Sequence, residues 1–230
     1  MKVGITQRIF LDSKGADRDS LEQDYTEYYQ KFGLEVIPIP NVLYNVEDYV
    51  EKLNIERIIL SGGGDINPKL YNSEPESGVE YQDKRDNTES ELLKLAIRKD
   101  IPLLAECRGC QFLNIFFNGS LVLNIQDNID NCVKHVASKH IIQIIDEKSA
   151  NFLNLREVEV NSYHNNGFTK KELSLELEAF ALSGGGIVEG VFHSKRALAG
   201  IMWHPERYKV PDEFNEKIVR AFLERKLFWK

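Results

Sequence analysis

Cysteine is scarce in this chain, which has three among its 230 residues. An odd and small number of cysteines cannot build a framework of disulfide bonds. The sequence therefore excludes the class of small, disulfide-stapled secreted domains. Any importance that the cysteines have is reactive or metal-binding.

Long hydrophobic runs and excess positive charge are also missing. No apolar stretch is long enough to span a membrane, and the opening MKVGITQR lacks the basic-then-apolar pattern of a signal peptide. Lys and Arg number 29 against 36 Asp and Glu, a formal net charge of −7. Nucleic acids and anionic membranes are recognised by a positive field, so neither is an expected partner. We expect a cytoplasmic protein.

The chain also contains no repeat, no low-complexity segment and no linker rich in Pro, Gly or Ser. Apolar residues make up 42% of it, enough for a substantial core. We therefore expect one domain over residues 1–230.

Short apolar runs alternate with longer amphipathic ones in the first half, which is typical of parallel strands flanked by helices. The pattern predicts strands at residues 2–6, 35–40, 57–60 and 101–107 and helices at 19–33, 46–54 and 86–100. From about residue 141 onward the apolar runs are closely spaced, which favours antiparallel hairpins. These runs are 141–146, 156–163, 175–182, 186–192 and 197–203, and a helix is predicted at 213–230. The fold class is α/β.

The segment ECRGCQFLN places two cysteines in a C-x-x-C, Cys107 and Cys110, which leaves three interpretations. With Cys132 and His135 they nominally complete a Cys3His zinc set. The C-x-x-C is also compatible with a redox pair. The third interpretation is a single nucleophile, since IPLLAEC resembles a buried strand and QFLNIFF an apolar helix. Cys107 then lies on a sharp strand-to-helix turn, where a helix N-terminus stabilises a thiolate.

A thiol nucleophile needs a base and an orienting group. His204 follows the apolar run 197–203, and Glu206 comes two residues later. In an extended segment such residues point to the same side, so Glu206 can fix the imidazole in one tautomer. The sequence Gly62-Gly63-Gly64 follows a buried strand, where glycine backbone can present N–H groups to an oxyanion. A plain turn is the alternative for these glycines.

Five motifs in chain order resemble the class I glutamine amidotransferase fold and, more narrowly, the γ-glutamyl hydrolases of the peptidase C26 group. They are SGGGDINPKLY (61–71), RDNTE (85–89), LLAECRGCQFLN (103–114), VNSYHNNGF (160–168) and GIMWHPER (200–207). The resemblance implies a single-domain, flavodoxin-like three-layer sandwich with a mostly parallel sheet and an antiparallel C-terminal part. It implies Cys107 as nucleophile, His204 as base, Glu206 as its orienting carboxylate, and an oxyanion hole at Gly63 and Arg108. No metal and no cofactor are expected.

Substrate contacts are expected at Gly62, Gln111, His164 and Arg8. The chain departs from the family pattern at Glu106, where an apolar residue is usual, and at Asn165-Asn166, where His-Gln is common. A carboxylate beside a thiol is unfavourable, so Glu106 should point away, pair with a cation or bind substrate.

The expected partner is a small γ-glutamyl compound, and a homodimer is compatible with the sequence. A free-standing hydrolase is favoured because the chain ends soon after the triad. A glutaminase subunit and a silent binding protein are the alternatives. TQR, RDSLEQ and PIPN resemble hydrolases of bacterial surface-polysaccharide clusters, which include the γ-glutamyl-CDP-amidate hydrolase of capsule phosphoramidate synthesis. This finer resemblance implies an anionic leaving group near Arg8, Arg18 and Asn41, unless the arginines pair with Asp17, Asp19 or Glu22.

Overall fold

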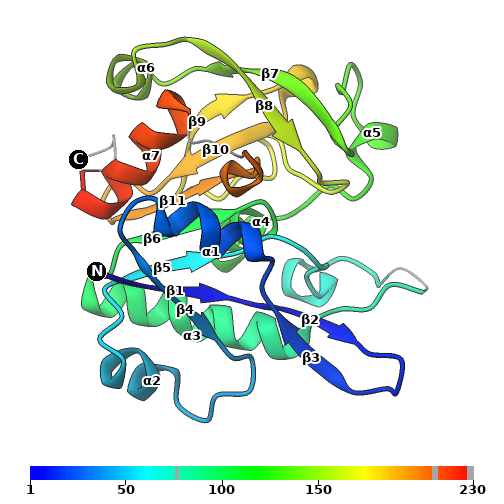
Figure 1. Cartoon of the computed structure of the whole chain (residues 1–230). Coiled ribbons are helices and arrows are strands. Elements are labelled where there is room, and N and C mark those ends of the chain that lie inside the picture. The colour runs from blue at the N-terminus through cyan, green and yellow to red at the C-terminus, as the bar shows by residue number, and fades with distance from the viewer. Residues whose placement is uncertain (76–77, 209–211, 227–230) are drawn as a thin grey trace.

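The computed structural model describes residues 1–75, 78–208 and 212–226. Within them, nine strands form one sheet in the order β4-β1-β5-β6-β11-β10-β9-β7-β8, and two more form a hairpin (Figure 1). The strands of the sheet are β1 Lys2–Thr6, β4 Glu35–Ile39, β5 Arg57–Leu60, β6 Leu103–Glu106, β7 Ser138–Ile144, β8 Glu157–Ser162, β9 Glu178–Leu182, β10 Val188–Phe192 and β11 Leu198–Ile201. The hairpin consists of β2 Arg8–Leu11 and β3 Asp17–Ser20.

The sheet has a parallel half and an antiparallel half, as the sequence predicts. β1 pairs in parallel with β4 and β5, β5 with β6, and β6 with β11. The remaining pairs, β11 with β10, β10 with β9, β9 with β7 and β7 with β8, are antiparallel. β11 belongs to both halves, so the last apolar run enters the parallel half instead of forming only a hairpin.

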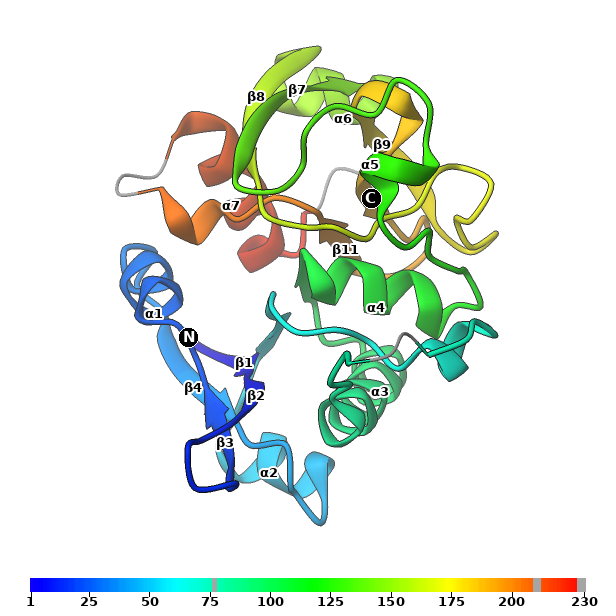
Figure 2. The ribbon, with the colours of Figure 1, turned by 90° about the vertical axis from the view of Figure 1, so that its right-hand side faces the viewer.

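Helices cover both faces of the sheet. They are α1 Gln23–Gln30, α2 Val46–Lys52, α3 Asp83–Lys99, α4 Arg108–Phe116, α5 Ile125–Asn128, α6 Glu147–Leu153 and α7 Glu213–Glu224, with short 3-10 turns η1 Pro68–Tyr71, η2 Gly184–Gly186 and η3 Pro205–Arg207. Figure 2 shows α1 and α7 on one side and α3 and α4 on the other. Because successive side chains of a strand point to opposite faces, the sheet separates two hydrophobic clusters. Ile59 of β5 packs with α1 and α7, whereas Ile58 and Leu60 pack with α3 and α4.

The parallel half positions the candidate site. β1, β5, β6 and β11 point in one direction, so the segments that follow them meet at one edge of the sheet. Ligands of open α/β sheets bind at this carboxyl edge. Arg8, Gly62, Cys107 and His204 all lie one to three residues beyond the ends of these strands.

The predicted start of the helix at 19–33 is wrong, because the helix begins only at Gln23. The preceding residues form β3 and pair with β2, with Arg8 opposite Ser20. The tight turn between the strands explains this, because Asp12 Oδ1 accepts hydrogen bonds from the backbone N–H groups of Lys14, at 2.8 Å, and Ala16, at 3.0 Å. Gly15 in the same turn has φ +79°. Asp-x-x-Gly turn chemistry therefore overrides the helical pattern.

Other helix boundaries also differ from the prediction, since α1 ends at Gln30 instead of residue 33 and α2 at Lys52 instead of residue 54. α3 begins at Asp83, three residues before the predicted start at residue 86, and Gln82 is its N-cap residue. Carboxylates at Asp83 and Asp86 in the first turn stabilise the helix dipole there. α7 ends at Glu224, and residues 227–230 of the predicted helix lie outside the described residues.

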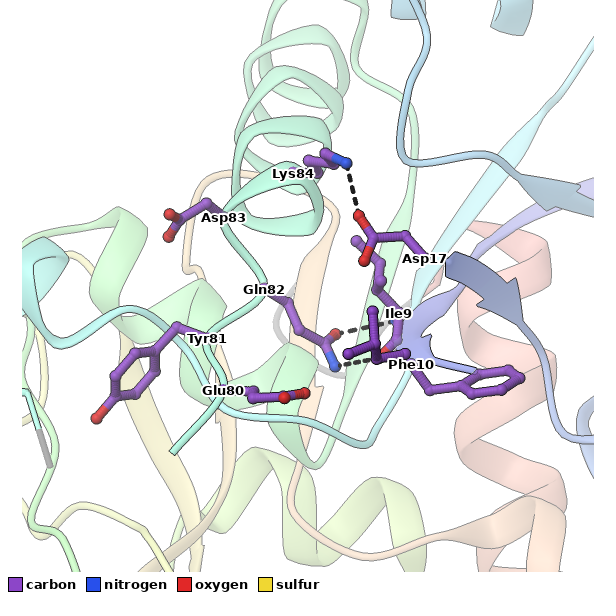
Figure 3. Close-up of a pocket in the computed structure, with 9 residues that line it drawn as sticks. Ile9, Phe10, Asp17, Glu80, Tyr81, Gln82, Asp83 and Lys84 are labelled. Atoms are coloured by element: carbon purple, nitrogen blue, oxygen red, sulfur yellow. Dashed lines mark hydrogen bonds and ion pairs between the residues drawn. The ribbon is translucent and has the colours of Figure 1, made fainter. Parts of the chain in front are cut away.

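The hairpin is fastened to the start of α3 beside a cavity of about 390 Å³ (Figure 3). Gln82 accepts a hydrogen bond from Ile9 N at 3.2 Å and donates one to Ile9 O at 2.8 Å. Lys84 forms an ion pair with Asp17 at 2.6 Å.

In the described part of the chain, no helix combines the length and the apolar character required to cross a bilayer.

Candidate active site

Cys107 occupies a strained turn between β6 and α4. Its backbone has φ +50° and ψ −106°, a conformation that residues with a Cβ rarely adopt. The turn is held because Cys107 N–H donates a hydrogen bond of 2.7 Å to Ile201 O. Gly109 is required next, since a Cβ there would lie 2.3 Å from Leu60 O. Cys107 therefore stands on an elbow, as the sequence predicts, whereas Cys110 is fully buried in the core.

His204 and Glu206 form a buried pair beyond the end of β11. His204 Nδ1 lies 2.7 Å from Glu206 Oε1. Burial lowers the pKa of His204, but the charges of Cys107 and Glu206 and hydrogen bonds to both outweigh it. The pKa of His204 is therefore well above its usual value, which favours the imidazolium form.

Asn161, which the sequence did not single out, fixes the backbone of His204. Its side-chain Oδ1 accepts a hydrogen bond from His204 N at 2.8 Å, and its Nδ2 donates one to His204 O at 2.8 Å. The residue lies in β8, far from His204 in sequence. Both polar ends of one buried amide thus set the direction of the segment that carries the imidazole.

Each glycine of the SGGG segment is required at its position for a different structural reason. Gly63 and Gly64 have φ +83° and +77°, in the left-handed region that favours glycine. A Cβ on Gly62 would lie 2.6 Å from His204 Cε1 and 3.5 Å from Cys107 Cβ. The imidazole of His204 and the side chain of Cys107 therefore both lie close to this loop.

A cavity of about 220 Å³ joins these residues. Its lining includes, from the predicted site, Gly63, Cys107, Arg108, Gln111, His164 and His204, together with Gly64, Asp65, Tyr163, Asn165, Asn166 and Arg207. Glu206 is buried behind His204, and Gly62 and Arg8 line a smaller adjoining recess. The predicted residues are thus brought together at one edge of the sheet.

Gln111 and His164 are both tied to Asn166. Gln111 Nε2 donates a hydrogen bond of 2.7 Å to Asn166 O, and His164 Nδ1 lies 3.0 Å from the same oxygen. Burial is the main cause that lowers the pKa of His164. His164 therefore favours the neutral form, and it lies in the lining of the cavity where a substrate contact is expected.

The RDNTE motif supplies a buried ionic network that supports the loop at 61–63. Arg85, which is fully buried, donates hydrogen bonds to Ser61 O at 2.5 Å and to Gly63 O at 2.5 Å. Glu89 accepts hydrogen bonds from Arg85 Nε at 2.8 Å and from Arg108, and Asp86 accepts another from Arg108. The i,i+4 spacing of Arg85 and Glu89 on a helix could have revealed this pair. Because the network holds the loop carbonyls and the first residue of α4, it fixes the two backbone N–H groups of the predicted oxyanion hole.

Among the described residues Glu106 forms no ion pair with Lys or Arg, so the expected cation pairing is not found, and the side chain binds a tyrosine instead. It is fully buried, and its Oε1 accepts a hydrogen bond from the hydroxyl of Tyr29 in α1. Burial, and then the nearby charge of Glu206, raise the pKa of Glu106 well above its usual value. The Oε2 atoms of Glu106 and Glu206 are both buried and lack a donor when both groups are ionised. A proton on Glu106 removes the repulsion and allows the two carboxyl groups to share a hydrogen bond.

Arg8 lies at the rim of the site, but Arg18 and Asn41 do not contact it. Arg8 forms an ion pair of 3.2 Å with Glu22, one of the partners anticipated for a surface arginine, and its side chain passes beside Gly63. Arg18 lies in β3, not at the start of a helix, and pairs with Asp12 at 2.9 Å. Asn41 is buried and binds Gln7 O and Asp19.

The sequence analysis did not identify Arg207, which lines the cavity and stacks on Tyr163 with its guanidinium carbon 4.1 Å from the ring centroid.

The Cys3His zinc set is not assembled. Among the described residues, the group with the spacing of metal ligands consists of His135, His164 and Glu189, with no cysteine. Cys110 packs in the core with Leu113 and Val191, which accounts for the C-x-x-C without a metal.

Comparison with known proteins supports the resemblance. The peptidase C26 family model matches residues 3–206. The chain belongs to the peptidase C26 family. The glutamine amidotransferase-like protein YvdE of Lactococcus lactis is 30% identical over 209 residues, which span 87% of this chain and 86% of YvdE. The γ-glutamyl-CDP-amidate hydrolase of Campylobacter jejuni is 31% identical over 209 residues, which span 90% of each chain.

Solved structures agree on the fold of this C26 family member. The glutaminase domain of CTPS from Trypanosoma brucei, solved with bound acivicin, matches with a TM-score of 0.64. The match covers 98% of this chain and 94% of that domain, at 12% sequence identity. The architecture is therefore the class I glutamine amidotransferase fold that the motifs implied, and the family relationship makes the protein a glutamine amidotransferase-like hydrolase.

Proposed function

We propose that the protein is a cysteine-dependent γ-glutamyl hydrolase with the triad Cys107, His204 and Glu206. The observation that carries the proposal is the arrangement at one cavity. Cys107 and His204 both face it, and Glu206 holds the far nitrogen of the imidazole at 2.7 Å. The raised pKa of His204 supports an imidazolium beside the Cys107 sulfur. Such a pair has an activated nucleophile and a base in one unit.

The reaction follows from this geometry. The Cys107 thiolate attacks the γ-carbonyl carbon of the substrate, and the oxygen that becomes negative is held by the backbone N–H groups of Gly63 and Arg108. As the C–N bond breaks, His204 gives its proton to the departing nitrogen, which leaves a γ-glutamyl thioester. His204 then takes a proton from water, and the resulting hydroxide attacks the thioester. The C–S bond then breaks, glutamate is released, and the thiolate and the protonated His204 are regenerated.

Substitution of the cysteines tests the nucleophile. We expect Cys107→Ser to abolish glutamate release from γ-glutamyl amides, whereas Cys110→Ala, inside the core, retains most of it. Mass spectrometry of acid-quenched wild type should detect a glutamyl group on Cys107. Equal losses in the two variants, or an adduct on another residue, would contradict the assignment. Hydrolysis of glutamine alone, stimulated by a synthase partner, would instead favour a glutaminase subunit.

For the leaving group we propose an anionic moiety, with γ-glutamyl-CDP-amidate as the best specific candidate and γ-glutamyl-γ-aminobutyrate as the alternative. The 31% identical Campylobacter jejuni hydrolase supports this substrate. Arg8 at the rim and Arg207 in the cavity lining supply positive charge beside the site. Guanidinium groups suit phosphate oxygens because their donors bind two at once.

Arg8→Ala and Arg18→Ala form a matched pair for this proposal, because Arg18 is an exposed arginine paired with Asp12 outside the cavity lining. We expect Arg8→Ala to lower kcat/KM for γ-glutamyl-CDP-amidate by about ten- to a hundredfold, with little change for γ-glutamyl-γ-aminobutyrate. Arg18→Ala should leave both unchanged. If the wild type used the two substrates equally, or Arg8→Ala kept the preference, the nucleotide substrate would be wrong.

A further inference from the structure

Three buried side chains converge behind the wall of the catalytic cavity. His135 precedes β7, His164 follows β8 and Glu189 lies in β10, and each is less than one-twentieth exposed. His135 Nδ1 lies 3.2 Å from His164 Nε2 and 3.4 Å from Glu189 Oε1, and His164 Nε2 lies 3.9 Å from Glu189 Oε2. Three elements that are distant in sequence thus bring two histidine nitrogens and the two oxygens of one carboxylate together.

The spacing fits the coordination sphere of a small metal ion. Zinc binds histidine nitrogen at about 2.0–2.1 Å, so neighbouring ligand atoms of a tetrahedral site are separated by roughly 3.3 Å. The separations of 3.2 and 3.4 Å lie close to this value, and the third, from His164 Nε2 to the second carboxylate oxygen, is 3.9 Å. Two histidines and one carboxylate are also a donor set that zinc and other first-row divalent ions use in proteins.

Two of the three side chains, His164 and Glu189, have outer contacts of the kind that metal ligands usually make, whereas His135 Nε2 has no hydrogen-bond partner in the described part of the chain. His164 Nδ1 is committed to Asn166 O at 3.0 Å, which leaves Nε2, the atom facing the cluster, with its lone pair. Glu189 accepts hydrogen bonds from Ser183 Oγ at 2.8 Å and from His140 Nε2 at 3.1 Å. Such partners fix the orientation of ligating side chains in metal sites.

We propose that His135, His164 and Glu189 form a binding site for one first-row divalent metal ion, with Zn²⁺ as the preferred ion. Bound there, the ion joins the segment before β7 to β10 and to the residues after β8. His164, Asn165 and Asn166 line the catalytic cavity, so the ion braces its wall. The site is independent of the proposed hydrolysis and takes no part in it.

The test uses the full chain carrying Cys107→Ser, because a reactive thiolate would bind zinc by itself. After removal of metals by a chelator, we expect one equivalent of Zn²⁺ to bind, measured by elemental analysis after dialysis. At a hundredfold excess over Kd, the melting temperature should rise by roughly 5 °C. Co²⁺ should produce the visible absorption of tetrahedral coordination by nitrogen and oxygen.

Variants in the same background locate the ion. We expect His135→Ala and Glu189→Gln to lose the Co²⁺ spectrum and the thermal shift. His193→Ala, which removes another buried histidine outside the cluster, and Cys132→Ser should keep both. No Zn²⁺ bound by the parent chain would overturn the proposal and leave a hydrogen-bonded histidine cluster. Binding that survives His135→Ala, or that is lost in Cys132→Ser, would place the ion elsewhere and overturn it too.

Discussion

Gly62→Ala gives the sharpest test of how the glycine loop and the imidazole fit together. A Cβ on Gly62 would approach His204 Cε1 to 2.6 Å, about 0.8 Å closer than the 3.4 Å at which ordinary contact begins. The backbone of Gly62 is not among the positive-φ glycines, so alanine is otherwise tolerated there. The imidazole is held by Glu206 on one side and must therefore retreat from its position beside Cys107.

A displacement of this size at a reacting group lowers the rate by about a hundredfold. We expect Gly62→Ala to reduce kcat by roughly 30- to 100-fold with a smaller change in KM. Crowding of a packed interior also costs about 1–3 kcal/mol of stability. Activity loss must therefore be separated from stability loss, and a second glycine makes this feasible.

Gly4→Ala is the matched control. Its Cβ would lie 2.7 Å from Ile39 Cδ1, a similar approach, but in the core away from the cavity. Both variants should lower the melting temperature by comparable amounts, while Gly4→Ala keeps kcat. The alkylation rate of Cys107 by iodoacetamide, followed by peptide mass spectrometry, is a readout that needs no substrate and should fall in Gly62→Ala alone. Wild-type kcat and alkylation in Gly62→Ala would refute the reasoning.

Two further predictions concern buried carboxyl groups. A raised pKa means that folded Glu106 keeps its proton above 4.5, the ordinary pKa of a glutamate in an unfolded chain, so its contribution to stability is lost as pH rises above that value. Glu106→Gln mimics the neutral acid. The melting temperature of this variant should therefore rise relative to that of wild type as pH rises from about 5 to 8, and turnover should be retained. A difference in melting temperature that stays constant across this range would show that Glu106 is ionised when folded. Glu89→Gln removes a charge that two buried arginines share, Arg85 and Arg108, and should cost about 3–5 kcal/mol, or roughly 10 °C in melting temperature. Glu91→Gln, which breaks an exposed pair on the same helix, should cost less than about 1 kcal/mol. Equal shifts in these two variants would show that the buried network is not what stabilises the loop.

The sequence by itself determined the strands of the parallel half of the sheet and the residues that follow them. Apolar alternation marked β1, β5, β6 and β11, and the chemistry-bearing residues follow these strands directly, as Cys107 follows β6. These features are local, because a strand pattern and the turn after it depend on a few consecutive residues. The position of Cys107 on an elbow, and of Glu206 beside His204, could be predicted for the same reason.

Only the tertiary structure decided which distant groups meet. Arg85 lies on a helix and supports the loop at 61–63, and Asn161 on β8 holds the backbone of His204. The protonation of Glu106 depends on its burial beside Glu206, a hundred residues away in the chain. The cluster of His135, His164 and Glu189 forms because three separate segments pack together. Burial and pairing are properties of the folded chain, since both depend on which segments exclude water from a group.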